Sequence, residues 1–184
     1  MRIISGSGRG RKLKAVPGEE TRPTSDRLNE AMFNIVQFAV EGRRVLDLFA
    51  GTGQLGIEAL SRGAAEAVFV DMAGGAIAVI RENIKSTGFE DRARVCAGEA
   101  LSFLSAEKGK FDLVFIDPPY HTALLQKTLA AAQKFDILRE GGILVVECAS
   151  DDALPEIQPP YVLLKTYEYG QKKIVTCARR EAAE

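Results

Sequence analysis

The tetrapeptide Asp117-Pro118-Pro119-Tyr120 combines a carboxylate, two prolines and an aromatic ring directly after an apolar run at 111–116. The prolines fix φ and remove two backbone N–H donors, so this turn presents hydrogen-bond acceptors. The Asp117 carboxylate and a proline carbonyl, that of Pro118 in the simplest geometry, suit the two N–H groups of an amino group on a planar ring. Such acceptors would aim the poorly nucleophilic amino nitrogen at an electrophilic methyl group. Tyr120 offers a face on which an unstacked base can lie.

The tetrapeptide therefore predicts methyl transfer to the exocyclic amino group of a nucleic-acid base, with all four residues as the catalytic set. An isolated Asp-Pro is also common in ordinary strand-to-helix turns, so the motif needs support from other parts of the chain. His121, the single histidine, follows directly. We expect it to cap the next helix or to line the pocket.

A glycine-rich segment follows the first apolar run. Asp47 lies within that run, and Ala50, Gly51 and Gly53 come after it. Together with Gly56, these glycines also fit the GxGxxG pattern of dinucleotide-binding folds, so an NAD-dependent oxidoreductase or a non-catalytic nucleotide-binding module is an alternative. We favour S-adenosylmethionine, because Asp47 is placed to hold its α-amino group directly or through water. The chain also shows no evident acid/base pair for hydride transfer.

Acidic residues also stand at the next two strand ends. Asp71 ends an apolar run and is placed to accept hydrogen bonds from ribose hydroxyls. Glu99 follows the next run and could accept from an adenine amino group, with the Ala100 amide beside it. The structural alternatives are a strand-end turn for Asp71 and a helix N-cap for Glu99. The predicted cofactor-binding residues are Asp47, Ala50, Gly51, Gly53, Asp71, Glu99, Ala100 and Asp117.

Five short apolar runs alternate with helical patterns. A helical stripe covers 25–40, and further helical segments are expected from about 54, at 76–87, at 99–105 and at 122–135. The apolar runs lie at 45–49, 67–71, 93–96, 111–116 and 142–147. Near-continuous apolar strands that alternate with helices indicate a parallel sheet covered on both faces, with ligands beyond its carboxyl ends. Residues 161–168 and 172–178, joined by a turn at Tyr169-Gly170, predict a closing antiparallel hairpin.

These elements predict an α/β fold of the class I methyltransferase type. It would be a Rossmann-like three-layer sandwich with a seven-stranded, mostly parallel sheet and a C-terminal antiparallel hairpin. The 184 residues fit one soluble domain, and no membrane span or leader is evident, so we expect a cytoplasmic protein. One histidine and three dispersed cysteines predict no metal site, and the cysteines read as buried apolar side chains.

The charge distribution is uneven along the chain. The formal net charge is only −1, but residues 1–18 carry five basic side chains and no acidic one. This pattern predicts a small basic N-terminal β extension over 1–24, followed by the methyltransferase domain over 25–184. A solvated, flexible tail is the alternative. A basic extension suits RNA phosphates, which supply much of nucleic-acid affinity.

The motifs together resemble the bacterial 16S ribosomal RNA guanine-N2 methyltransferase family over nearly the whole chain. The block from Arg22 to Arg27, which lies between the basic segment and the first helix, narrows the resemblance from amino-methyltransferases in general to this family. Asp71 departs from the Glu common there, which gives a shorter reach to the ribose. The matching segments are 2–6, 9–11, 22–27, 30–34, 47–53, 55–64, 117–120 and 169–173.

The resemblance implies transfer of a methyl group from S-adenosylmethionine to N2 of one guanine in small-subunit ribosomal RNA, as free RNA or in a ribosomal particle. We expect the protein to act as a monomer. Arg22 and Arg27 admit a structural alternative, pairing with Asp26 or Glu30. DNA or RNA adenine-N6 or cytosine-N4 methylation and small-molecule methylation remain alternatives. The predicted RNA-binding residues are Arg2, Arg9, Arg11, Lys12, Arg22, Thr24 and Arg27.

Overall fold

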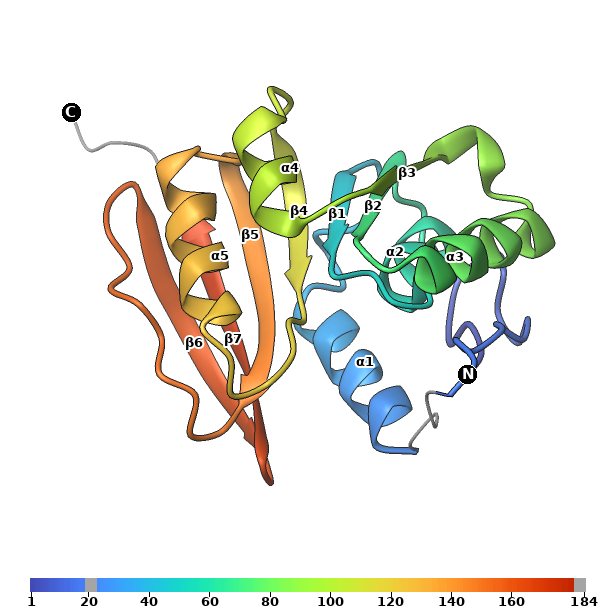
Figure 1. Cartoon of the computed structure of the whole chain (residues 1–184), viewed down its shortest axis with the longest axis horizontal. Coiled ribbons are helices and arrows are strands. Elements are labelled where there is room, and N and C mark those ends of the chain that lie inside the picture. The colour runs from blue at the N-terminus through green and yellow to red at the C-terminus, as the bar shows by residue number, and fades with distance from the viewer. Residues whose placement is uncertain (19–22, 181–184) are drawn as a thin grey trace.

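Seven strands form one sheet in the computed structural model of the chain, which describes residues 1–18 and 23–180 and no side chains for 23–26 (Figure 1). The strand order is β3-β2-β1-β4-β5-β7-β6. The first five strands are parallel, and β7 runs antiparallel to both β5 and β6. The fold prediction is confirmed. The strands are β1 (Arg44–Leu48), β2 (Glu66–Asp71), β3 (Ala93–Ala97), β4 (Phe111–Ile116), β5 (Leu138–Ala149), β6 (Tyr161–Tyr169) and β7 (Lys172–Arg179).

Helices cover both faces of the sheet. Val45 and Phe115 pack in a core with α1, α2 and α3, whereas their strand neighbours Leu46 and Ile116 pack in a second core with α4 and α5. Both faces of these strands are therefore buried, which explains why their sequences are apolar without alternation. The described helices are α1 (Pro23–Ile35), α2 (Gln54–Ser61), α3 (Gly74–Thr87), α4 (Ala100–Ala106) and α5 (Leu124–Lys134), with a 3-10 turn at Glu90–Arg92.

The first helix is shorter than the 25–40 stripe predicted, because α1 ends at Ile35. The Ala39 N–H donates to the Val36 carbonyl at 2.8 Å, which tightens the chain into a turn that leads to β1. Val36 and Val40 are nevertheless buried, while Phe38 is 94% exposed. The apolar spacing correctly identified core residues, but the last of them reach the core from a turn.

Strand β5 is longer than the 142–147 run predicted. It begins at Leu138, which pairs with Phe111, and the register with β4 shifts before Leu113 pairs with Ile143. Gly141, with φ of 71°, lies in this irregular part. The polar and glycine residues at 139–142 hid the early start, because a bulged strand loses the apolar pattern.

The N-terminal hairpin, which we define as residues 1–14, is docked on the body of the protein. It contains one antiparallel bridge, Arg2 to Lys12, where the sequence predicted a β extension. Ile3 and Leu13 are buried in the first core. Residues 19–22, which include Arg22, lie outside the described part, so the boundary at 24 stays a prediction.

Buried polar side chains of α2 and α3 hold this hairpin. The Glu58 carboxylate accepts from the amides of Ile4 at 2.7 Å and Ser5 at 3.0 Å, and Asn83 exchanges hydrogen bonds with the backbone of Lys14. At Gly6, with φ of +81°, a Cβ would lie 1.9 Å from the Ser61 carbonyl oxygen, so only glycine fits. These contacts argue against a flexible tail for residues 1–14.

Candidate active site at the carboxyl ends of the strands

The loop between β1 and α2 has an unusual backbone. Gly51 and Gly53 have φ of 56° and 77°, in the left-handed region that glycine tolerates, and Phe49 has φ of 82°, which is strained for a side chain of its size. At Gly56 a Cβ would lie 2.2 Å from the Phe69 ring, so this glycine allows α2 to pack closely on β2. The glycines predicted to bind cofactor therefore form a tight loop at the strand end.

Asp47 lies beneath this loop and is 3% exposed. Its Oδ2 accepts a 2.9 Å hydrogen bond from the Gly56 amide. Burial raises the pKa of Asp47 to about 7, the bond from Gly56 opposes that shift, and the negative charge of Asp71 adds to it. Asp47 thus fixes the glycine loop from below, and its contact with a cofactor stays a prediction.

A cavity of about 160 Å³ opens beside the loop. It brings together Asp71, Glu99 and Ala100, which the sequence predicted as cofactor residues from two different strand ends. The rest of its wall is mostly apolar, and such a wall can pack against the face of an aromatic base. The lining residues are Phe49, Val70, Asp71, Met72, Gly98, Glu99, Ala100, Leu101 and Leu124.

The two acids of the cavity differ in how they are held. Asp71 Oδ2 accepts from the Gly51 amide at 2.8 Å and Oδ1 from the Ala73 amide at 2.9 Å, so the strand-end-turn alternative describes part of its role. Glu99 stands at the N-cap position of α4 but its side chain makes no capping hydrogen bond. Glu99 therefore occupies the N-cap position without capping the helix through its side chain, and its exposed carboxylate lies at the cavity rim.

Asp117 leaves the end of β4, the neighbour of β1. Since Leu48 pairs with Ile116 on one side and with Val70 on the other, Asp117 and Asp71 flank the strained Phe49. The chain order reverses between β1 and β4, and open α/β sheets bind ligands at such a point. The tetrapeptide therefore lies where the fold places a reacting group.

The proline turn presents acceptors as predicted. The Pro119 carbonyl accepts from the Thr122 hydroxyl at 2.7 Å, whereas the Pro118 carbonyl has no hydrogen-bond partner among the described residues. Burial raises the pKa of Asp117 well above its usual range. The charges of Glu147 and Asp47 add to this shift, while Lys172 opposes it. The Asp117 carboxyl is thus a stronger proton acceptor than an ordinary aspartate.

Two residues that the sequence reasoning missed hold Tyr120. Its hydroxyl donates to Glu147 Oε1, and Lys172 Nζ donates to the same oxygen at 2.7 Å. The Lys172 ammonium also lies 5.0 Å from the centroid of the Tyr120 ring. An acid at the end of an apolar strand, as at Asp47, Asp71 and Asp117, was the available signal for Glu147.

His121 does not occupy the N-cap position of the next helix, and its expected place in the wall of the pocket for the target base stays a prediction. Its Nδ1 lies 3.7 Å from carboxylate oxygens of Asp151 and Asp152, in the loop after β5. The N-cap position of α5 is Ala123, and His121 is not among the residues that line the cavity. The left-handed backbone at His121, with φ of 55°, turns it away from the helix start.

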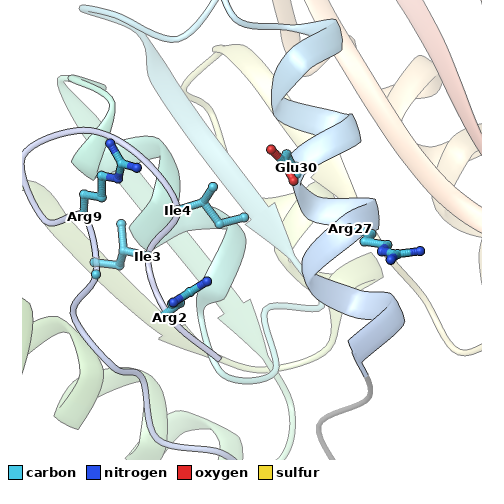
Figure 2. A pocket seen from close by; sticks show the side chains of 7 residues that line it. Arg2, Ile3, Ile4, Arg9, Arg27 and Glu30 are labelled. Atoms are coloured by element: carbon cyan, nitrogen blue, oxygen red, sulfur yellow. The ribbon is translucent and has the colours of Figure 1, made fainter.

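A second cavity, of about 320 Å³, lies between the N-terminal hairpin and α1 (Figure 2). Arg2 and Arg9 reach it from the hairpin, and Arg27 and Glu30 from α1. The three arginines are exposed. Arg27 makes no ion pair with Glu30, and the side chain of Asp26 is outside the described part. Three of the predicted RNA-binding residues therefore share one groove, called here the basic groove.

The other predicted RNA-binding residues are placed differently. Arg11 is exposed, and its Nη1 donates to the Thr87 carbonyl at 2.6 Å. This bond caps the C-terminus of α3. Lys12 is exposed beside its bridge to Arg2. Arg22 lies outside the described residues, and so does the side chain of Thr24.

No described helix has both the length and the apolar character that a membrane crossing requires. Within 1–18 and 23–180, no three His, Cys, Asp or Glu side chains are grouped as metal ligands would be. The free cysteines Cys148 and Cys177 are buried, in agreement with their reading as apolar side chains, whereas Cys96 is only partly buried and accepts a hydrogen bond from Arg94 Nε, so that reading is wrong for it.

Comparison with known proteins places this site in a family. Residues 1–178 match the family described as "Conserved hypothetical protein 95". A Bacillus subtilis protein named as a candidate rRNA methyltransferase, YlbH, is 39% identical over 183 residues, which cover 98% of this chain and 100% of the relative. Escherichia coli ribosomal RNA small subunit methyltransferase D is 34% identical over 171 residues, 93% of this chain and 86% of the relative.

A solved structure agrees with these relatives. An Escherichia coli protein titled as a candidate methyltransferase, yhhF, superposes with a TM-score of 0.85 at 35% identity, covering 98% of each chain. The superposition includes both the sheet and the N-terminal hairpin, since it covers 98% of each chain. The chain belongs to the conserved hypothetical protein 95 family, together with ribosomal RNA small subunit methyltransferase D.

Proposed function

We propose that this protein transfers a methyl group from S-adenosylmethionine to the exocyclic N2 of a guanine in small-subunit ribosomal RNA. The observation that carries the proposal is the Asp117–Tyr120 turn at the strand end beside an apolar cavity with two acidic residues. Family membership supports the substrate, because the curated Escherichia coli relative is named a small-subunit ribosomal RNA methyltransferase. We place the enzyme in the cytoplasm as a monomer.

The cavity at the ends of β2 and β3 fits the adenosine part of the cofactor. Its apolar wall would cover the base, Asp71 would accept from the ribose hydroxyls, and Glu99 with the Ala100 amide would meet the adenine edge. Asp47, Ala50, Gly51 and Gly53 form the loop that would hold the methionine part. S-adenosylmethionine, when bound, supplies the electrophilic methyl group.

The tetrapeptide prepares the acceptor nitrogen. The Asp117 carboxylate and the Pro118 carbonyl, which has no partner among the described residues, would each accept one N–H of the guanine amino group, which directs its lone pair toward the methyl donor. Attack needs no prior loss of a proton. The raised pKa of Asp117 then suits this carboxylate to take the proton that the methylated nitrogen releases.

The basic groove would bind RNA phosphates. Arg2, Arg9 and Arg27 are exposed, and together they exceed the single acid, Glu30, that shares the groove with them. Because the hairpin that carries Arg2 and Arg9 is fastened to α2 and α3, these cations keep a fixed position relative to the active site. A fixed spacing of this kind selects where the target base lies.

The test is direct. The protein is incubated with methyl-labelled cofactor and small-subunit RNA, free or in particles that lack the modification, and the product is digested to nucleosides. We expect label in N2-methylguanosine alone. Label in N6-methyladenosine or N4-methylcytosine would assign the same chemistry to another base, and NADH binding without S-adenosylmethionine binding would remove the methyltransferase proposal altogether.

A further inference from the structure

Tyr120 is held at both ends of its side chain. Its backbone follows two prolines, and its hydroxyl donates to Glu147 Oε1 on β5. Glu147 is only 4% exposed. A ring that served only as packing would need no buried charged acceptor, because desolvating a carboxylate is unfavourable unless it is paired.

Lys172 provides that pairing and contacts the ring as well. Its Nζ donates to Glu147 Oε1 at 2.7 Å and lies 5.0 Å from the centroid of the Tyr120 ring. Lys172 begins β7, and β5 and β7 are paired from Ile143 to Ala149, so both charged residues stand on a rigid part of the sheet. Side chains on paired strands hold geometry better than side chains on loops.

We propose that Glu147 and Lys172 are positioning residues that fix the Tyr120 ring in the orientation that stacks on the target base. The inference rests on the proposed methyltransferase function. The hydroxyl bond to Glu147 fixes the direction of the ring axis, and the Lys172 ammonium over the ring restricts its rotation about that axis. A base that enters the site then meets one ring orientation instead of several, which lowers the entropy lost on reaching the reactive arrangement.

Glu147 and Lys172 also affect the neighbouring carboxyl group of Asp117. Glu147 lies close enough to Asp117 to raise the pKa of that carboxyl, after burial, while Lys172 lowers it. Removing either charged residue therefore changes both the ring and the proton acceptor. An experiment has to separate these two effects.

A double-mutant cycle on Tyr120 and Glu147 does so. Tyr120→Phe keeps the ring and removes the hydroxyl, and Glu147→Gln keeps the size of the acceptor and removes its charge. We expect each single change to lower kcat for unmodified small-subunit particles about tenfold, with KM for the cofactor changed less than twofold. The double variant should be no more than about threefold slower than the slower single variant, because both changes act on the same charge-assisted hydrogen bond, which Tyr120→Phe removes and Glu147→Gln weakens.

Lysine variants provide the matched comparison. Lys172→Arg should restore most of the kcat that Lys172→Met loses, since the guanidinium can still pair with Glu147. Lys173→Met is the control, because Lys173 donates only to the carbonyls of Ser150 and Asp152. Multiplicative losses in the double variant, or an unchanged kcat for Glu147→Gln, would overturn the proposal. Thermal unfolding of each variant shows whether a loss of kcat reflects unfolding.

A measurement without RNA separates this proposal from the proposed function. In protein labelled with 13C at tyrosine Cζ, the Tyr120 resonance is identified by its absence in Tyr120→Phe. Glu147→Gln should shift that resonance, and Lys173→Met should leave it in place. If wild type labels another nucleoside, the guanine assignment fails and the cycle is measured on that nucleoside. If the resonance shifts while kcat is unchanged, the contact exists and the positioning role is refuted.

Discussion

Acidic side chains stand at both ends of the central strands, but their surroundings differ. At the carboxyl ends, Asp47, Asp117 and Glu147 are buried or partly buried, and Lys172 is the cation that the described part of the chain places beside Glu147 and Asp117. Burial raises the pKa of Asp47 and of Asp117; the charge of Asp71 adds to the shift of Asp47, and the charges of Glu147 and Asp47 add to the shift of Asp117. This end of the sheet therefore holds charge that the fold does not fully compensate.

The amino ends show the opposite arrangement. Asp136 accepts from Arg179 at 2.7 Å and also pairs with Lys110, and these bonds lower its pKa. Asp112 on β4 pairs with Arg139 at 3.3 Å and accepts from the Arg44 amide. Every one of these acids has an adjacent guanidinium.

The difference separates stabilising acids from functional ones. Paired surface acids add modestly to stability, whereas buried acids whose charge is not fully compensated reduce it and persist where chemistry needs a perturbed proton affinity. Asp112 at one end of β4 and Asp117 just beyond the other are the same residue type, and we expect them to have different roles. Variants of these acids should show the contrast directly.

The largest effect is expected for Asp117→Ala. It removes both the acceptor for the amino N–H and the proton acceptor, so kcat should fall by at least about 10³-fold. Binding of S-adenosylmethionine, measured by calorimetry, should weaken less than tenfold. Asp112→Ala, on the same strand, is the control and should keep kcat within about threefold while lowering the unfolding midpoint. A large loss of cofactor affinity in Asp117→Ala would show that its role had been assigned wrongly.

Asp47→Asn tests the unfavourable charge beneath the glycine loop. The folded-state pKa of about 7 exceeds the usual 3.8, so the folded protein binds the proton more tightly than the unfolded chain. Stability from this group is present at low pH and is lost as pH rises toward and through 7. The amide still accepts from Gly56, so the variant should be more stable than wild type by about 2 kcal/mol at pH 8 and nearly equal at pH 4. Urea unfolding at the two pH values gives the difference. A variant that is less stable at pH 8 would contradict it.

The basic groove allows a comparison of exposed cations. Arg9→Ala should weaken binding to small-subunit RNA about fivefold to tenfold and reduce the salt slope of log K by about one. Arg139→Ala is matched, because its side chain is 55% exposed but lies at the amino end, and it should bind RNA as wild type does. Filter binding at several salt concentrations measures both slopes. Equal weakening in the two variants would mean that the RNA contact is not confined to the groove.

Much of this contrast could be predicted from the sequence, and part of it could not. The acids Asp47, Asp71 and Asp117 were identified because parallel strands bring their carboxyl ends to one edge, and local apolar runs reveal those strands. The N-terminal hairpin was identified by its charge, but its attachment was not. Glu58 and Asn83 bind it through backbone amides, which leave no pattern in the sequence of the hairpin.

The missed residues have a common physical reason. Glu147 and Lys172 act through contacts across strands β5 and β7, and the pairing of these strands depends on a register that no local pattern gives. The early start of β5 was missed for a similar reason, since its bulge interrupts the apolar run. His121 was assigned to the helix start by its position in the chain, whereas its left-handed backbone directs it to the loop after β5.

The smallest effect is expected for Asp136→Asn at the amino end. Asparagine tolerates the left-handed backbone at this position, φ of 46°, so the change removes the charge and little else. Because the pKa of Asp136 is lowered in the folded protein, its stabilising contribution is present above the unfolded pKa and is lost as pH falls.

The variant should therefore be less stable than wild type by about 1 kcal/mol at pH 7, with the difference shrinking as pH falls below the usual 3.8 of an aspartate and shrinking at high salt. Urea unfolding measures it, and kcat should be unchanged. This pH dependence has the opposite sign to that of Asp47→Asn. If both aspartates gave the same sign, the division of the sheet into a stabilising end and a functional end would be wrong, because it requires the folded protein to release a proton at one end and to retain it at the other.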